Sequence, residues 1–356
     1  MDAKQYLDER KTLYNHLLDF IDNSYDDQNN FTTLISDIQN QNITQNKNEL
    51  HLFLSLLTTI ANNHHRYSNF FNKIDNILSF LNLIIKQKFS NLEIFDIFKS
   101  NNRLLLFFIK NDFFTNDKKI MEKINDIDYF SKSNDCDEKV KEKRENGEND
   151  SYICQLIRDD SVVQFISYTN QANCPLSETI KNSIYETNEF LIRKDVTLLE
   201  YAAFFGSIQI FKYLMLQGCK LTSRSLFLLA IHSNSAEMIH LLEENKILPG
   251  KGIKWLYEAI KCHHNNIVNY IINNYIQEKG LCQSFRYYNF EIITQNEVDY
   301  SFLINSCKHN YVELVKILLQ KAENDITNKK IIIIFIKFKI HVHLIKFLIL
   351  WNLMKI

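Results

Sequence analysis

Glycine and proline are scarce in this sequence, which contains only 6 Gly and 2 Pro in 356 residues. Average usage at this length would give roughly 25 Gly and 18 Pro. Loops that bind nucleotide phosphates need several glycines at fixed spacings, and neither GxGxxG nor GxxxxGK(S/T) is present. Sandwiches and barrels need frequent tight turns, which Gly, Pro or Asn usually form. The scarcity therefore disfavours nucleotide binding through either loop and favours a helical protein.

The chain also lacks an excess of charge of either sign. Lys and Arg together number 41, Asp and Glu number 42, and the formal charge at neutral pH is −1. Non-specific attraction to nucleic acid comes mainly from clustered, excess Lys and Arg. We therefore expect no nucleic-acid partner.

The chain has no paired cysteine motif, and its first residues do not indicate export through a signal peptide. The seven cysteines form no CxxC pair, and their odd number does not fit a closed set of disulfides. The first twenty residues are charged throughout and lack the apolar core of a signal peptide. The sequence therefore predicts a reducing, cytoplasmic location.

One stretch, residues 331–356, is apolar enough to be considered as a membrane segment. It is interrupted by Lys337, Lys339 and Lys346. Lysines near the centre of a spanning helix cost about 2.5–3.5 kcal/mol each on insertion scales. We expect no membrane span; a degenerate helical hairpin is the preferred interpretation, and an amphipathic surface anchor is the alternative.

The first 130 residues predict helices, because apolar side chains recur at spacings of three and four, as in 50–57 and 74–85. Residues 131–150 mix charges of both signs with almost no apolar side chains, so this segment should not enter a core. We expect a helical N-terminal domain at 1–130 and a charged linker at 131–150. Residues 151–195 are expected to form a degenerate half-repeat or connecting helices.

Four similar segments follow. Their second positions hold small residues, as close helix packing requires: Ala202, Ala230, Ala259 and Ser306. Four positions later come residue types that tolerate positive φ: Gly206, Asn234, His263 and Asn310. Each segment predicts a helix, a tight reversal and a second helix. An insertion at 277–298 separates the third copy from the fourth.

The spacing resembles that of the ankyrin repeat. Its signature T-P-L-H-x-A-A-x-x-G-H is approached by residues 197–207, TLLEYAAFFGS, in which Thr197 and Glu200 form a capping-box pattern. The strings at 61–66, 89–103, 147–161, 200–214 and 260–267 also resemble shared blocks of a large ankyrin-repeat family expanded in trichomonad protists. In that family a helical N-terminal region of unknown function precedes a variable number of repeats. The resemblance implies an all-α protein with a short, degenerate ankyrin-type α-solenoid at 196–320 and a degenerate C-terminal repeat or tail at 321–356.

Ankyrin repeats bind proteins and share no catalytic activity. The resemblance therefore implies a non-catalytic scaffold or adaptor that binds a protein partner through its concave surface. In ankyrin repeats the two residues after the paired alanines often face the concave groove, which makes the candidates Phe204, Phe205, His232, Ser233, Lys261, Cys262, Lys308 and His309. The alternative for Phe204 and Phe205 is that they pack under the N-terminal domain or an earlier half-repeat near Leu156 to Ile166.

Histidines at 64–65, 263–264 and 341/343 raise the question of a metal site. Adjacent helical residues point about 100° apart, whereas helical ligand pairs stand at i and i+4, and no third ligand completes either adjacent pair. Cys262 and His263 are neighbours in sequence and cannot by themselves form a nucleophile–base couple. We expect no metal, no cofactor and no catalytic residue. The rival hypothesis is an enzyme whose site lies in the N-terminal helices, near 62–66 or 93–103.

Overall fold

A computed structural model of the chain describes residues 2–23, 28–67, 69–130, 137–192, 195–221, 226–247, 253–276 and 280–324. Within these ranges the regular secondary structure is helical and contains no β-strand, although Thr179 and Thr197 form one isolated bridge. The predicted all-α class is confirmed. No helix in the same ranges is both long and apolar enough to cross a bilayer. The Ile-rich stretch at 331–356 lies outside the described residues.

The N-terminal region consists of successive helices. They are α1 (Ala3–Asp22), α2 (Gln28–Asn40), α3 (Lys47–Asn63), α4 (Phe70–Lys88), α5 (Asn91–Phe98), α6 (Asn102–Lys110), α7 (Lys118–Asn125) and the 3-10 helix η1 (Asp128–Phe130). Asn46 and Asn101 cap α3 and α6 through their side chains, and Ser90 forms a capping box with Glu93 on α5. The apolar sets predicted at 50–57 and 74–85 lie on the buried faces of α3 and α4.

The segment expected to be a charged linker contains a packed helix. Residues Glu138–Asn146 form α8, which contacts α6 and ends at Gly147 with a φ of 64°. Val140 and Arg144 are buried, whereas most other side chains of α8 are exposed. The apolar pattern did not predict this packing, because Val140 is the only apolar residue of the helix.

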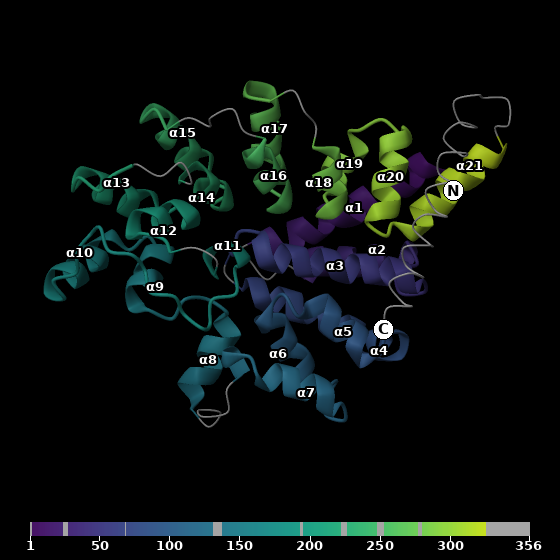
Figure 1. Ribbon diagram of the computed structural model, residues 1–356, viewed down its shortest axis with the longest axis horizontal. Helices are drawn as coiled ribbons and strands as arrows, with labels where there is room; N and C mark the ends of the chain where they lie inside the picture. Colours follow the sequence, from purple (N-terminus) through teal and green to yellow (C-terminus); the bar gives the residue numbers. More distant parts are fainter. Residues whose placement is uncertain are drawn as a thin grey trace, which may run out of the picture.

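Six helix pairs follow in the described part of the chain. Their members are α9 and α10 (Tyr152–Arg158, Val162–Gln171), α12 and α13 (Leu198–Phe205, Ile208–Leu216), α14 and α15 (Leu226–His232, Ala236–Glu244), α16 and α17 (Lys254–Lys261, Asn265–Asn274), α18 and α19 (Leu281–Arg286, Phe290–Thr294), and α20 and α21 (Tyr300–Lys308, Val312–Asn324). A short helix, α11 (Glu189–Ile192), precedes the second pair. The first helices of successive pairs contact one another in chain order, so the pairs form a row (Figure 1).

Each pair reverses at a residue with positive φ, between 45° and 72°: Asp160, Gly206, Asn234, His263, Tyr288 and Asn310. Two of these reversals differ from the sequence expectation. The stretch interpreted as an insertion, 277–298, contains the fifth pair, which the residue columns did not reveal because its helices are short and tyrosine occupies its reversal. The region interpreted as a half-repeat or connecting helices, 151–195, contains a full first pair that turns at Asp160.

Side chains that follow the reversals link one pair to the preceding pair. Each donates a hydrogen bond to a backbone carbonyl of the previous first helix: Ser207 Oγ to Ile157 (2.5 Å), His264 Nδ1 to Ile231 (2.7 Å), Asn289 Nδ2 to Ile260 (3.2 Å) and Tyr311 OH to Phe285 (3.0 Å). Each of these carbonyls also accepts the backbone N–H of the reversal residue three positions on, so the side-chain bond is its second hydrogen bond. The column of small residues, Ala202, Ala230, Ala259 and Ser306, is fully buried and now includes Ser284.

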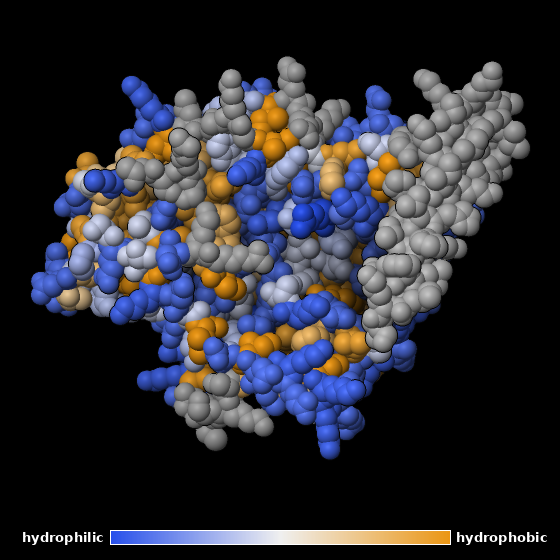
Figure 2. All heavy atoms as spheres, viewed as in Figure 1, coloured by the Kyte–Doolittle hydropathy of each residue, from blue (hydrophilic) through white to orange (hydrophobic). Residues whose placement is uncertain are grey.

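The structure has two hydrophobic cores, and the first of them joins segments that are far apart in the sequence. The first joins the N-terminal helices to the last two pairs through Phe285, Phe290, Ile293, Phe302, Tyr311 and Leu314. The second extends from Cys154 to Ile292 and lies mainly within the first four pairs. Helix α1 packs on α19 and α21, and Figure 1 shows α1 and α3 lying along the row. Figure 2 shows hydrophilic side chains interspersed with hydrophobic ones on this face.

Candidate functional site

The eight residues predicted to bind a partner lie at the C-terminal ends of the first helices, beside the reversals. We call this side of the row the turn face. Phe204, His232, Ser233 and Cys262 are buried, with exposed fractions of 5% or less. Phe205, Lys261 and His309 are partly buried, and Lys308 is exposed. Half of the set therefore does not line an open groove.

The chain's own α3 and α11 account for this burial. The ring of Phe190, on α11, lies 4.6 Å from that of His232 and 6.2 Å from that of Phe204. Phe204 and His232 stack at 4.7 Å. Phe204 thus packs against α11, which precedes its own helix pair but lies outside both the N-terminal domain and the stretch near 156–166. Phe205 contacts Tyr201, with ring centroids 4.6 Å apart.

The two histidine pairs of the sequence meet at this junction. His64, which follows α3, is 99% buried, and its Nδ1 and Nε2 lie 2.6 Å from the Cys262 carbonyl and from Asp22 Oδ1. Because both partners are acceptors, both ring nitrogens donate and the ring is an imidazolium. Burial by itself would lower the pKa of His64, but Asp22 and the Cys262 carbonyl outweigh it and raise that pKa.

The neighbouring histidines are neutral. Burial, together with the charge on His64, lowers the pKa of His65 to about 4 and lowers those of His263 and His264 well below their usual value. Tyr14 of α1 lies 3.1 Å from His263 Nδ1, and the side chain of Asn265 donates to Tyr14. These contacts make the histidines part of the packing between the N-terminal helices and the turn face.

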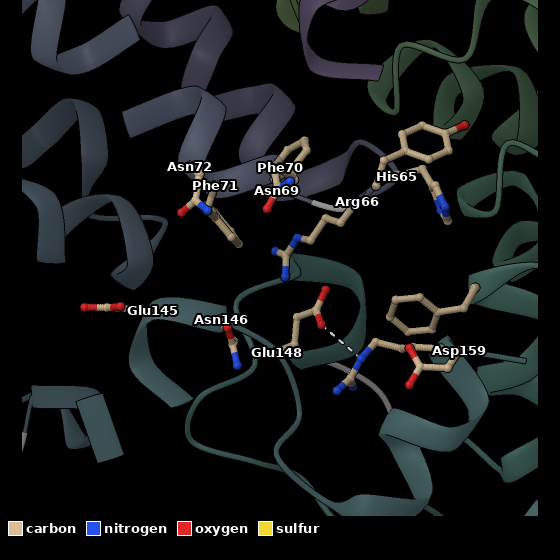
Figure 3. Close-up of a pocket in the computed structure, with 13 residues that line it drawn as sticks. His65, Arg66, Asn69, Phe70, Phe71, Asn72, Glu145, Asn146, Glu148 and Asp159 are labelled. Carbon is tan, nitrogen blue, oxygen red and sulfur yellow. Dashed lines mark ion pairs between the residues drawn. The ribbon is translucent and has the colours of Figure 1, made fainter. Parts of the chain in front are cut away.

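A cavity of about 380 Å³ opens beside this junction (Figure 3). Its walls come from the loop after α3, the start of α4, the end of α8, the end of α9 and Phe205 of α12. Arg66, Glu148 and Arg158 contribute charged groups, and Asp159 stands at its exposed rim. Polar groups from segments far apart in the sequence therefore converge on one concave site.

Arg66 is built into the cavity wall. It donates to the carbonyls of Gly147 (2.9 Å) and Ala61 (3.3 Å) and to Thr187 Oγ1 (3.0 Å), and its guanidinium lies over the Phe71 ring. Its side chain is only 5% exposed. Among the residues that the structure describes, its Nε has no hydrogen-bond partner. This Nε is itself buried, and the guanidinium pairs with the buried Glu186 at 3.6 Å, so Arg66 acts mainly as a fixed part of the wall.

The titratable side chains of the cavity are poorly suited to general acid–base catalysis. Arg158 pairs with Glu148 at 2.9 Å and donates to Tyr201 OH at 2.9 Å. A general base works best with a pKa near the working pH, and the pKa of His65 is lowered to about 4 by burial and by His64. The sequence flagged 62–66 but missed Glu148 and Arg158, since no spacing pattern joins residues that only tertiary packing brings together.

Comparison with protein-family models, with curated proteins and with solved structures finds no match for this chain. The resemblance to ankyrin repeats therefore depends on the residue columns themselves.

Proposed function

We propose that this chain is a non-catalytic, cytoplasmic protein-binding scaffold or adaptor built on an ankyrin-type solenoid. The main support is the row of six helix pairs, with a positive-φ residue at each equivalent reversal and a hydrogen bond from the next residue to the preceding pair at four of the five junctions. Stacked helical repeats form extended surfaces suited to binding other proteins.

The packing of the chain on its own turn face leaves only part of the predicted binding surface accessible to a partner. The N-terminal helices and α11 cover much of the turn face, so Phe204, His232, Ser233 and Cys262 are internal. The accessible members of the predicted set are Phe205, Lys261, Lys308 and His309. A partner would contact these residues at the margin of the N-terminal region, where partly exposed aromatic and cationic side chains offer anchoring area and charge.

Paired variants of the full-length chain test this proposal. Phe205→Ala with Lys308→Glu alters the proposed surface, and Leu216→Ala with Lys212→Glu alters exposed positions of α13 as a control. Both pairs should leave the far-ultraviolet circular dichroism unchanged. Quantitative affinity purification from cells that express the protein should show bound proteins lost only with the first pair. Identical sets of bound proteins for both variants would contradict the proposed surface.

The cavity beside Arg66 supports a second candidate, a small-ligand or enzymatic site in the N-terminal region. The observation in its favour is a concave site with a buried cation next to His65. Phe205→Trp should fill the cavity, and Leu216→Trp adds the same side chain at an exposed position. A small carboxylate or phosphate that raises the melting temperature of the wild type and of the control, but not of the cavity variant, would support this function. The absence of any such compound from a broad panel would remove it.

A further inference from the structure

Three metal-ligating side chains meet between α14 and α16. His232 ends α14, and Glu258 and Cys262 stand one turn apart on α16 and its C-cap. One ligand atom from each lies within 4.8 Å of the other two, and this is the only such group among the described residues. No spacing pattern in the sequence reveals this group, because its residues come from two consecutive helix pairs.

Two of the donor separations are near those of a tetrahedral site. His232 Nε2 lies 2.8 Å from Glu258 Oε1, and Cys262 Sγ lies 3.8 Å from Nε2 and 3.4 Å from Nδ1 of the same ring. Zinc bonds to nitrogen, oxygen and sulfur at ordinary lengths would place these donors about 3.4–3.6 Å apart. The carboxylate would have to move about half an ångström away from Nε2 and the sulfur slightly toward it, while Glu258 and Cys262 already lie within 4.8 Å of each other. The stacked ring of Phe204, 4.7 Å away, holds the imidazole in place.

The electrostatics also suit a dication. Zinc with one thiolate, one carboxylate and a neutral imidazole makes a site of zero net charge, which a buried position tolerates best. The thiol proton would leave to solvent as the metal binds. Lys261 Nζ lies 2.7 Å from Glu258 Oε1, the same oxygen that faces His232, so the ion would have to displace this ammonium, whose side chain is 14% exposed. Sulfur and imidazole ligands select zinc over magnesium or calcium.

We propose that His232, Glu258 and Cys262 bind a zinc ion that joins the third and fourth helix pairs. Three protein ligands leave a fourth position, which water can reach on the side of Glu258. The ion would stabilise the part of the turn face that packs against α11 and the end of α3. This proposal is independent of any partner of the solenoid.

Metal titration of the full-length chain tests the site. Protein stripped with EDTA is titrated with zinc chloride in a calorimeter and with cobalt chloride in a spectrophotometer. One equivalent of zinc should bind, and cobalt should give the absorption of a tetrahedral ion with a thiolate ligand. Cys262→Ser and Glu258→Gln should each weaken zinc binding about tenfold or more, and Cys262→Ser should remove the thiolate absorption.

Two exposed positions provide controls. Cys282→Ser and His240→Gln remove a thiol and an imidazole elsewhere and should leave zinc binding unchanged. Circular dichroism checks the fold of every variant, and Glu258→Gln decides the question if Cys262→Ser does not fold, because the glutamate side chain reaches solvent. Failure to bind near one equivalent, or unchanged binding in the folded site variants, would overturn the proposal.

Discussion

Single residues determine where each helix pair turns. Glycine takes a positive φ without a steric penalty, yet only Gly206 of the six reversal residues is a glycine. At Tyr288 and Asn310, as at His263, the next residue's backbone N–H closes the turn by bonding the carbonyl five positions back. Packing and these bonds offset the cost of the left-handed conformation.

Two glycines with positive φ, Gly206 and Gly218, should differ in how much stability a substitution by alanine costs. Gly206 and Gly218 both have positive φ, of 72° and 80°, but a Cβ on Gly206 would lie 3.2 Å from Ser233 Cβ, whereas nothing lies within 4 Å of one on Gly218. Gly218→Ala should cost about 1 kcal/mol of unfolding free energy through the backbone alone, and Gly206→Ala about 1 kcal/mol more. Urea unfolding measures both values. Equal losses would mean that Ser233 moves aside without cost.

At the scale of elements, helix length and caps explain which predictions succeeded. The capping box predicted from Thr197 and Glu200 is present at the start of α12. The fifth pair was missed because α18 and α19 span only 6 and 5 residues, too few to show an apolar period. Asn289, whose side chain caps α19 and bonds Ile260, is a signal that could have found it.

The capping box of α5 predicts a pH dependence. Hydrogen bonds from Lys47, and then from the backbone and hydroxyl of Ser90, lower the pKa of Glu93 to about 2. A carboxylate with a lowered folded pKa stabilises fully above its unfolded pKa, and that stability is lost as pH falls through the folded value. Because 42% of the side chain is exposed, screening limits the effect to about 0.5–1 kcal/mol.

Glu93→Gln should therefore lower the unfolding free energy at pH 7, and its difference from the wild type should shrink as pH falls from about 5 toward 2. Denaturant unfolding at several pH values measures this. Glu142→Gln, on an exposed part of α8, is the control and should differ little from the wild type at any pH. A Glu93→Gln difference that does not change with pH would contradict the assigned role of the carboxylate.

At the scale of the whole molecule, the N-terminal region and the last helix pairs form one folding unit. Six buried side chains of α18–α21 belong to the same core as α1–α7. Lys11 of α1 pairs with Glu291 of α19 at 3.0 Å, and Tyr14 reaches His263. Removing the N-terminal helices would expose this apolar surface.

A fragment of residues 151–356 should therefore lose the structure of α18–α21 and keep that of α12–α16, whose core lies within the fragment. Hydrogen exchange read by mass spectrometry should show amides of α18–α21 exchanging about a hundredfold faster than in the full-length chain. Protection of α12–α16 should change far less. Unaltered exchange throughout α18–α21 would show that the last pairs fold without the N-terminal helices.

The sequence by itself determined the helical class and the residue columns that define four of the six reversals. Those features depend on local spacing and on the few residue types that tolerate a close helix contact or a positive φ, such as Ala202 and Gly206. Only the tertiary structure decided that Phe204, His232 and Cys262 are buried. These side chains are buried by contacts with α11 and with the end of α3. The spacing of nearby residues in the sequence cannot predict such tertiary contacts.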